Sequence, residues 1–293
     1  MKAVARKSDR RFITTGRFRR KRFYLADHVF LDPGVRSNKA NDPLSKKQWD
    51  RLMALPTDVL LRTTDHMGTM IWDMQRQWSA WMDALPIDPK DQPFCHLSYL
   101  DVLDELAAAP FVAVHGYYRQ AASGLRNALE VMAHSCRYAI RDDEPSFRDW
   151  QEDVSKQPKF GNSIDIIGEA PAGRALDARL GGQGLFGSKP DGVMRALYAN
   201  LCRYAHSQPK FSNGAIWQSN GPVFVPRAFT QLWLDFCDTS LACFALLKLA
   251  YQPAIGSGIF ELIAGNAGVS WHGLAPATVK ALGLSPLNDP RPR

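Results

Sequence analysis

Residues 111–141, FVAVHGYYRQAASGLRNALEVMAHSCRYAIR, decide the fold that the sequence predicts. No proline interrupts this stretch, and residues of good helix propensity dominate it, so we expect one long helix. Most of its circumference is apolar, which is typical of a helix inside a protein core. We therefore predict a mainly α fold, a helical bundle packed around this segment.

A stripe of polar side chains runs along that predicted helix. At 100° per residue, its members fall within about 80° of each other on a helical wheel. They are Arg119, Ser123, Arg126, Glu130, His134 and Arg137. Because an unpaired buried charge is energetically expensive, the stripe must find polar partners on another segment.

Apolar spacing, capping residues and prolines predict further helices on both sides of this segment. Their ranges are 45–56, 58–84, 98–109, 146–155, 163–169, 172–180, 192–206 and 227–250. Pro56 and Pro110 are expected to end the helices that precede them, because proline has no backbone donor. Residues 215–225, AIWQSNGPVFV, predict one small β-hairpin around a Ser-Asn-Gly turn.

The chain divides by composition into a basic arm with an irregular stretch (1–44), a helical body (45–250) and a Gly/Ala/Pro-rich segment (251–293). The overall charge of +7 comes from the arm, since residues 1–22 hold ten basic side chains and one acidic, a net charge of +9. All other residues together carry −2. The basicity is therefore a property of the arm and not of the body.

The function of the arm has two interpretations. Aromatic residues alternate with its bases, which favours contact with RNA or another nucleic acid, since rings stack on bases and cations pair with phosphates. The other interpretation is a solubilising tail. The side chains that we assign to nucleic-acid binding are Arg17, Arg19, Arg20, Lys21 and Arg22.

Several classes of function have no support in the sequence. The five cysteines show no CxxC pair, which predicts reduced thiols in a cytoplasmic protein, and no histidine spacing predicts a metal site or a cofactor. Residues 182–187 spell G-x-G-x-x-G, but no βαβ pattern surrounds them, so we expect a loop. Residues 229–251 are apolar but contain Asp235, Asp238 and Lys248, which predicts a core helix and not a membrane span.

The strongest candidate site joins helix 111–141 to helix 192–206. Arg126 and Glu130 are i, i+4 partners on the first helix, and Arg203 and His206 lie one turn apart at the end of the second. If the helices pack together, these four side chains form one polar cluster. Spacing alone favours a structural charge network over a catalytic one.

The patterns LRNALE (125–130), LYANLCRYAHSQP (197–209) and SNGPVFV (219–225) resemble the HEPN-like helical domains of prokaryotic abortive-infection and toxin–antitoxin proteins. The resemblance covers roughly 110–250. It implies a helical bundle, often dimeric, and in many members a metal-independent ribonuclease whose Arg and His are spaced R-x(4–6)-H. It also implies that His206 is the histidine, although Arg203 has two residues between it and His206 and Arg195 has ten, so neither arginine fits the R-x(4–6)-H spacing.

Two hypotheses follow. In the first, the chain is an RNA-targeting defence effector, in which His206 provides acid–base chemistry, Arg203 and Arg126 stabilise phosphate charge, and Glu130 orients an arginine. In the second, it is a non-catalytic interaction module whose body dimerises or holds a partner protein while the arm binds nucleic acid or an acidic surface. Both predict no cofactor and no membrane, and we expect a homodimer.

Overall fold

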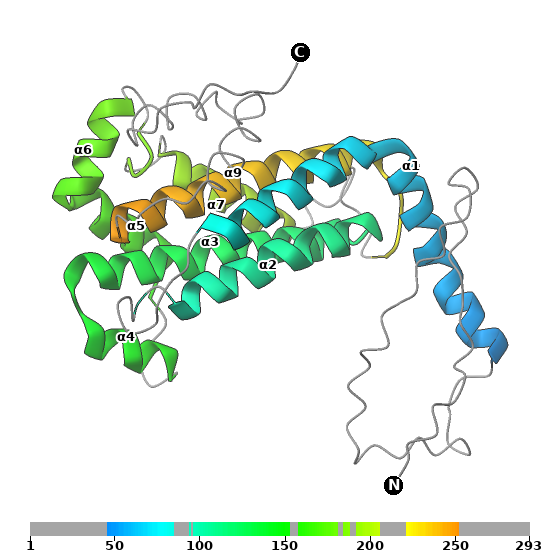
Figure 1. Cartoon of the computed structure of the whole chain (residues 1–293), viewed down its shortest axis with the longest axis horizontal. Helices are drawn as coiled ribbons and strands as arrows, with labels where there is room; N and C mark the ends of the chain where they lie inside the picture. Colours follow the sequence, from blue (N-terminus) through cyan, green and yellow to red (C-terminus); the bar gives the residue numbers. More distant parts are fainter. Residues whose placement is uncertain are drawn as a thin grey trace, which may run out of the picture.

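The computed structural model describes residues 46–84, 94, 96–152, 158–180, 184–187, 192–205 and 221–251. Within them the chain is mainly helical and contains no strand (Figure 1). The helices are α1 (Lys46–Ala84), α2 (His96–Val114), α3 (Tyr118–Arg141), α4 (Glu144–Gln151), α5 (Phe160–Glu169), α6 (Pro171–Leu180), α7 (Val193–Ala205) and α9 (Pro226–Tyr251). The predicted mainly α fold is confirmed.

Helix α3 forms the centre of the bundle. Figure 1 shows it running alongside α2 and α9, and it also packs against α5 and α7. Its side chains Leu125, Leu129 and Met132 are completely buried, as its apolar pattern predicts. The polar stripe on the same helix is partly exposed, with only His134 among its members fully buried, and its position is fixed by the surrounding helices.

The prediction of one helix over 111–141 is wrong in its first turns. Residues 111–114 end α2, and α3 begins only at Tyr118. The break lies at Gly116, whose φ of +84° is accessible to glycine. A Cβ on Gly116 would lie 2.4 Å from the backbone nitrogen and oxygen of Val223, so this turn lets the segment before α9 pass close to it. The Tyr118 hydroxyl accepts a 3.0 Å hydrogen bond from the backbone N–H of Val225 in the same segment.

The predicted stops at proline are also wrong. Pro56 lies inside α1 and Pro110 lies inside α2. Thr57 does not cap a new helix, because its hydroxyl donates to the carbonyl of Met53 at 2.8 Å, one turn earlier in the same helix. A kink occurs instead at Met67, where φ is −121° and ψ is 18°. Both prolines are therefore accommodated inside helices that continue past them.

The helix predicted over 192–206 is confirmed as α7, and the one predicted over 227–250 is confirmed as α9. The predicted β-hairpin is not shown, because residues 221–225 form no strand and residues 215–220 lie outside the described part. The 1–44 arm also lies outside the described part, and so do His206 and residues 252–293. The arm includes the proposed nucleic-acid contacts Arg17, Arg19, Arg20, Lys21 and Arg22. In the described part, no helix is long and apolar enough to cross a membrane.

Candidate functional site

The polar stripe of α3 meets α7 in a closed network of hydrogen bonds. The Arg126 guanidinium lies 2.8 Å from Glu130 Oε2, one turn along the same helix. It also donates to the Tyr198 hydroxyl of α7, from Nη2 at 2.9 Å and from Nε at 3.2 Å. That hydroxyl in turn donates to Glu130 Oε1 at 3.1 Å. The three side chains therefore form a closed set of hydrogen bonds.

Tyr198 is the member of this network that the sequence did not reveal. Its ring stacks on Phe160 of α5, with the ring centroids 4.0 Å apart and the planes 9° from parallel. Burial, together with the nearby Glu130 charge, raises the pKa of Tyr198 to about 12, so the hydroxyl keeps its proton and remains a donor. The network thus ties α3, α5 and α7 together.

The other predicted site residues stand at or beyond the end of α7. Arg203 is exposed in the last turn of α7, and His206 lies outside the described residues. At the same end of α7, Arg119 donates from Nε to the backbone carbonyl of Tyr204 at 3.1 Å, which satisfies a carbonyl left free by the helix end. Of the proposed catalytic set, the structure therefore brings together Arg126 and Glu130.

A second pair of contacts fixes α7 against α5. Arg195 forms an ion pair with Asp165 and donates to the carbonyl of Gly161 at 2.9 Å. A Cβ on Gly161 would lie 2.7 Å from the guanidinium, so glycine at this position leaves room for Arg195. This arginine, like Arg126, acts as a connection between helices.

Two backbone donors of the glycine-rich loop at 182–187 are taken by a carboxylate of the protein. The Asp177 carboxylate accepts the N–H of Leu185 at 2.6 Å and the N–H of Phe186 at 3.3 Å. Both of these loop side chains are buried. Phosphate-binding loops present such N–H groups to the ligand, whereas here a carboxylate of the protein occupies them. The loop prediction is in agreement with this arrangement.

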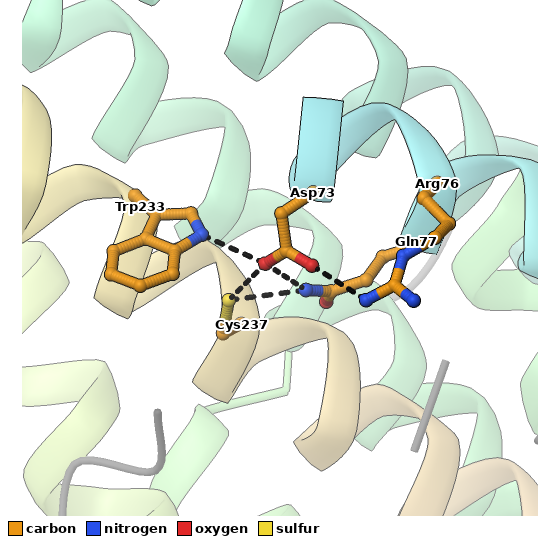
Figure 2. Close-up of polar contacts among 5 residues, drawn as sticks. All are labelled: Asp73, Arg76, Gln77, Trp233 and Cys237. Carbon is orange, nitrogen blue, oxygen red and sulfur yellow. Dashed lines mark hydrogen bonds and ion pairs between the residues drawn. The ribbon is translucent and has the colours of Figure 1, made fainter. Parts of the chain in front are cut away.

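A carboxylate-centred contact joins α1 to α9 (Figure 2). Asp73 Oδ2 accepts from Trp233 Nε1 at 2.9 Å and from Gln77 Nε2 at 3.0 Å, and the Cys237 thiol lies 3.8 Å away. Asp73 Oδ1 accepts from Arg76 at 3.0 Å. Burial raises the pKa of the Cys237 thiol, which makes it a poor nucleophile and leaves a structural role for this contact.

An acidic cleft of about 460 Å³ opens beside the same polar stripe, between α2, α3 and α4. Asp101, Asp104 and Glu105 line it from α2, and Asn127, Glu130, Val131 and His134 from α3. Ala108 of α2 and Trp150 of α4 complete the described lining. No described lining residue is a lysine or an arginine. The sequence signal was the run Asp-Val-Leu-Asp-Glu, whose acids recur at helical spacing, but their meeting with α3 depends on tertiary packing.

The α2 carboxylates of this cleft have few donors in the described part of the chain. Glu105 accepts from Asn127 at 3.3 Å, and burial together with the charges of Asp101 and Asp104 raises its pKa. Burial and the charge of Asp104 likewise raise the pKa of Asp101. These shifts mark carboxylates that lack compensating positive charge.

His134 forms the inner end of the cleft. Its ring is 1% exposed, its Nδ1 lies 2.9 Å from Ser163 Oγ, and its Nε2 has no hydrogen-bond partner in the described part of the chain. The nearest carboxylate oxygen, Glu130 Oε1, is 4.0 Å from that nitrogen. Burial, with the Arg137 charge, lowers the pKa of His134 to about 4, so the ring is neutral at pH 7.

Neither the cleft nor the α3–α7 network is arranged as a metal site. Across the described residues, no group of three or more His, Cys, Asp or Glu side chains converges closely enough to hold a metal ion. No protein-family model matches the chain, and no curated protein or solved structure matches it either. Function must therefore be argued from the residues themselves.

Proposed function

We propose that the chain is a nucleic-acid-binding module that does not cleave its ligand, with the basic arm as the contact and the helical body as the scaffold. This is the non-catalytic form of the HEPN-like interpretation, in a prokaryotic defence or toxin–antitoxin setting. The observation that carries the proposal is the closed Arg126–Glu130–Tyr198 network, in which a potential phosphate-binding arginine is already occupied.

The charge distribution agrees with this division of labour. A phosphate approaching α3 from the cleft side meets Asp101, Glu105 and Glu130, which would repel it. The arm, in contrast, holds ten bases among residues 1–22. Contacts of that kind bind phosphates without sequence preference and weaken steeply with salt.

Dimerisation belongs to the same proposal. The aromatic side chains of Trp72 on α1 and Phe111 on α2 are each 68% exposed, which is unusual for residues of this size. A second copy or a partner protein would remove such surface from water. Light scattering of the full chain gives the mass directly, and the proposal expects twice the mass of one chain.

The test is a single-stranded RNA of defined length, mixed with the full chain in buffer without divalent metal. We expect the RNA to shift on a native gel and to keep its length on a denaturing gel. Replacement of Arg17, Arg19, Arg20, Lys21 and Arg22 by Gln should weaken binding by about tenfold or more and flatten its salt dependence.

The matched control changes the charge equally at exposed arginines of the body and should leave binding within about threefold of wild type. Those positions are Arg62, Arg141, Arg148, Arg174 and Arg227. RNA shortened by wild type but not by His206→Ala would overturn the proposal in favour of the ribonuclease, with His206 and Arg203 at its centre. Equal losses in the arm variant and the control would remove the arm as the contact.

A further inference from the structure

The acidic cleft between α2, α3 and α4 has the chemistry of a binding site for a positively charged ligand, independently of the proposed function. Carboxylates from two helices, Asp101 and Glu105 of α2 and Glu130 of α3, face the same space of about 460 Å³. Glu130 is paired with Arg126 at 2.8 Å, whereas Asp101 and Glu105 have no lysine or arginine beside them among the described lining residues. Bringing such like charges together costs energy unless a cation neutralises them. Within the described residues, the one side-chain donor to the α2 carboxylates of the cleft is the Asn127 amide, which bonds Glu105 at 3.3 Å.

The second observation is the unpartnered nitrogen at the inner end of the cleft. His134 is almost completely buried, its Nδ1 is taken by Ser163, and its Nε2 has no hydrogen-bond partner among the described residues. With the Nδ1 proton donated to Ser163, Nε2 is a bare acceptor. A buried polar atom without a partner is costly, so a ligand N–H placed between this nitrogen and Glu130 would satisfy both.

The arrangement of the lining selects the type of cation. The carboxylates do not converge into a metal-binding group in the described part of the chain, which argues against a bare metal ion. Apolar surface alternates with the acids, from Ala108, Val131 and the Trp150 ring. The Trp150 ring packs edge-on to His134, with the ring centroids 5.7 Å apart, and so forms one wall of the cleft. Aromatic walls attract cations and also cover methylene groups.

We propose that this cleft binds a small linear polyamine, whose ammonium groups pair with the carboxylates while its methylene segments lie on Ala108, Val131 and Trp150. One terminal ammonium lies between Glu130 and His134 Nε2. The other end of the ligand pairs with Asp101 and Glu105. The volume of the cleft falls in the range of small-molecule sites.

The experiment is isothermal titration calorimetry of the full chain with spermidine at physiological salt. We expect saturable binding of one spermidine per chain. Putrescine, which carries one ammonium fewer, should bind about tenfold more weakly. Mg²⁺ binding as tightly as spermidine, or with the same dependence on the cleft residues, would overturn the proposal.

The decisive variant pairs Asp101→Asn with Glu105→Gln, and the control pairs Asp65→Asn with Glu169→Gln at exposed positions outside the cleft. Both variants change the net charge equally. We expect affinity for spermidine to fall at least about tenfold in the cleft variant and to change less than about twofold in the control. Equal losses in the two would show attraction by net charge alone and overturn the assignment.

The contribution of His134 is tested separately by His134→Phe, which keeps a buried ring and removes the acceptor. Its melting temperature is recorded first, and binding is measured at a temperature where the variant remains folded. If His134→Phe binds spermidine more weakly than wild type does, and binds putrescine more weakly by the same factor, the result supports the bridge to Nε2. Unchanged affinity in a folded variant removes His134 from the site and contradicts the proposed pose.

Discussion

Asp73 and the carboxylates of the acidic cleft show two ways in which this bundle places negative charge. Asp73 accepts hydrogen bonds from Trp233, Gln77 and Arg76 on two helices (Figure 2). Asp101 and Glu105 face an open space, repel each other and share little compensation. A carboxylate surrounded by donors holds helices together, whereas carboxylates short of donors are available to a ligand.

The α3–α7 network belongs with Asp73 in this comparison. Arg126, Glu130 and Tyr198 hydrogen-bond to one another, so replacing any of them should cost stability. Residues kept for chemistry or binding often behave in the opposite way, because removing them relieves strain or repulsion. The sign of the stability change therefore separates the two kinds of region.

The largest expected effect is at Asp73. Asp73→Ala leaves the Trp233 indole N–H without its acceptor and removes one acceptor of the buried Gln77 amide, which also donates to Cys237 Sγ at 3.2 Å. We expect a loss of about 4 kcal/mol in the free energy of unfolding. Chemical denaturation followed by circular dichroism measures this. The control is Asp65→Ala on the exposed face of α1, which should cost less than about 0.5 kcal/mol. Equal effects would mean that the donors around Asp73 contribute nothing.

Asp235 on α9 gives a pH-dependent effect of the next size. Burial raises its pKa from 3.8 to about 7, although Gln231 and Asn200 both donate to it. Because the folded-state pKa exceeds the unfolded one, this group's stabilising contribution is present below pH 4 and is lost as pH rises to 7. Between pH 5 and pH 8 the loss from Asp235 alone is about 3 kcal/mol.

The contribution of His134 to stability changes with pH in the opposite direction to that of Asp235, so the test must compare wild type with a variant. Its folded-state pKa of about 4 lies below the ordinary 6.5, and its contribution is present above pH 6.5 and lost as pH falls toward 4. The difference in unfolding free energy between wild type and Asp235→Asn, taken at pH 5 and at pH 8, cancels the histidine. We expect the variant to gain on wild type at pH 8. A difference independent of pH would contradict the raised pKa of Asp235.

A smaller effect is expected from Tyr198→Phe. The substitution keeps the stacking on Phe160 and removes the hydroxyl that Arg126 and Glu130 share. We expect a loss of about 1 kcal/mol in the free energy of unfolding, measured by urea denaturation. A gain in stability would mean that this hydroxyl, like the cleft carboxylates, does not hold the helices together.

The smallest effect, and the one of opposite sign, is expected from Asp101→Asn. Removing one of the cleft's mutually repelling charges should leave the free energy of unfolding unchanged or raise it by about 0.5 kcal/mol. Thermal melts at low and high salt check this, since salt screens the repulsion and should shrink the gain. A loss comparable to that of Asp73→Ala would mean that the cleft carboxylates are structural.

The sequence predicted the mainly α fold and the pairing of Arg126 with Glu130, because both depend on local helical spacing. It did not predict the break at Gly116, which is imposed by Val223, more than a hundred residues away. Nor did it predict Tyr198, since a tyrosine on an amphipathic helix gives no signal for its hydroxyl's partners. The cleft combined acids visible in the sequence with a facing helix whose placement only tertiary packing determines.

The central claim is that the charged stripe on α3 is a connection between helices and not a centre for cleaving RNA. A double-mutant cycle with Arg126→Ala and Tyr198→Phe measures this claim most directly, through the free energies of unfolding of both single variants and the double variant. We predict that each single variant is destabilised and that the coupling energy is about 1 kcal/mol. An Arg126→Ala variant as stable as wild type, with no coupling to Tyr198, would contradict the account.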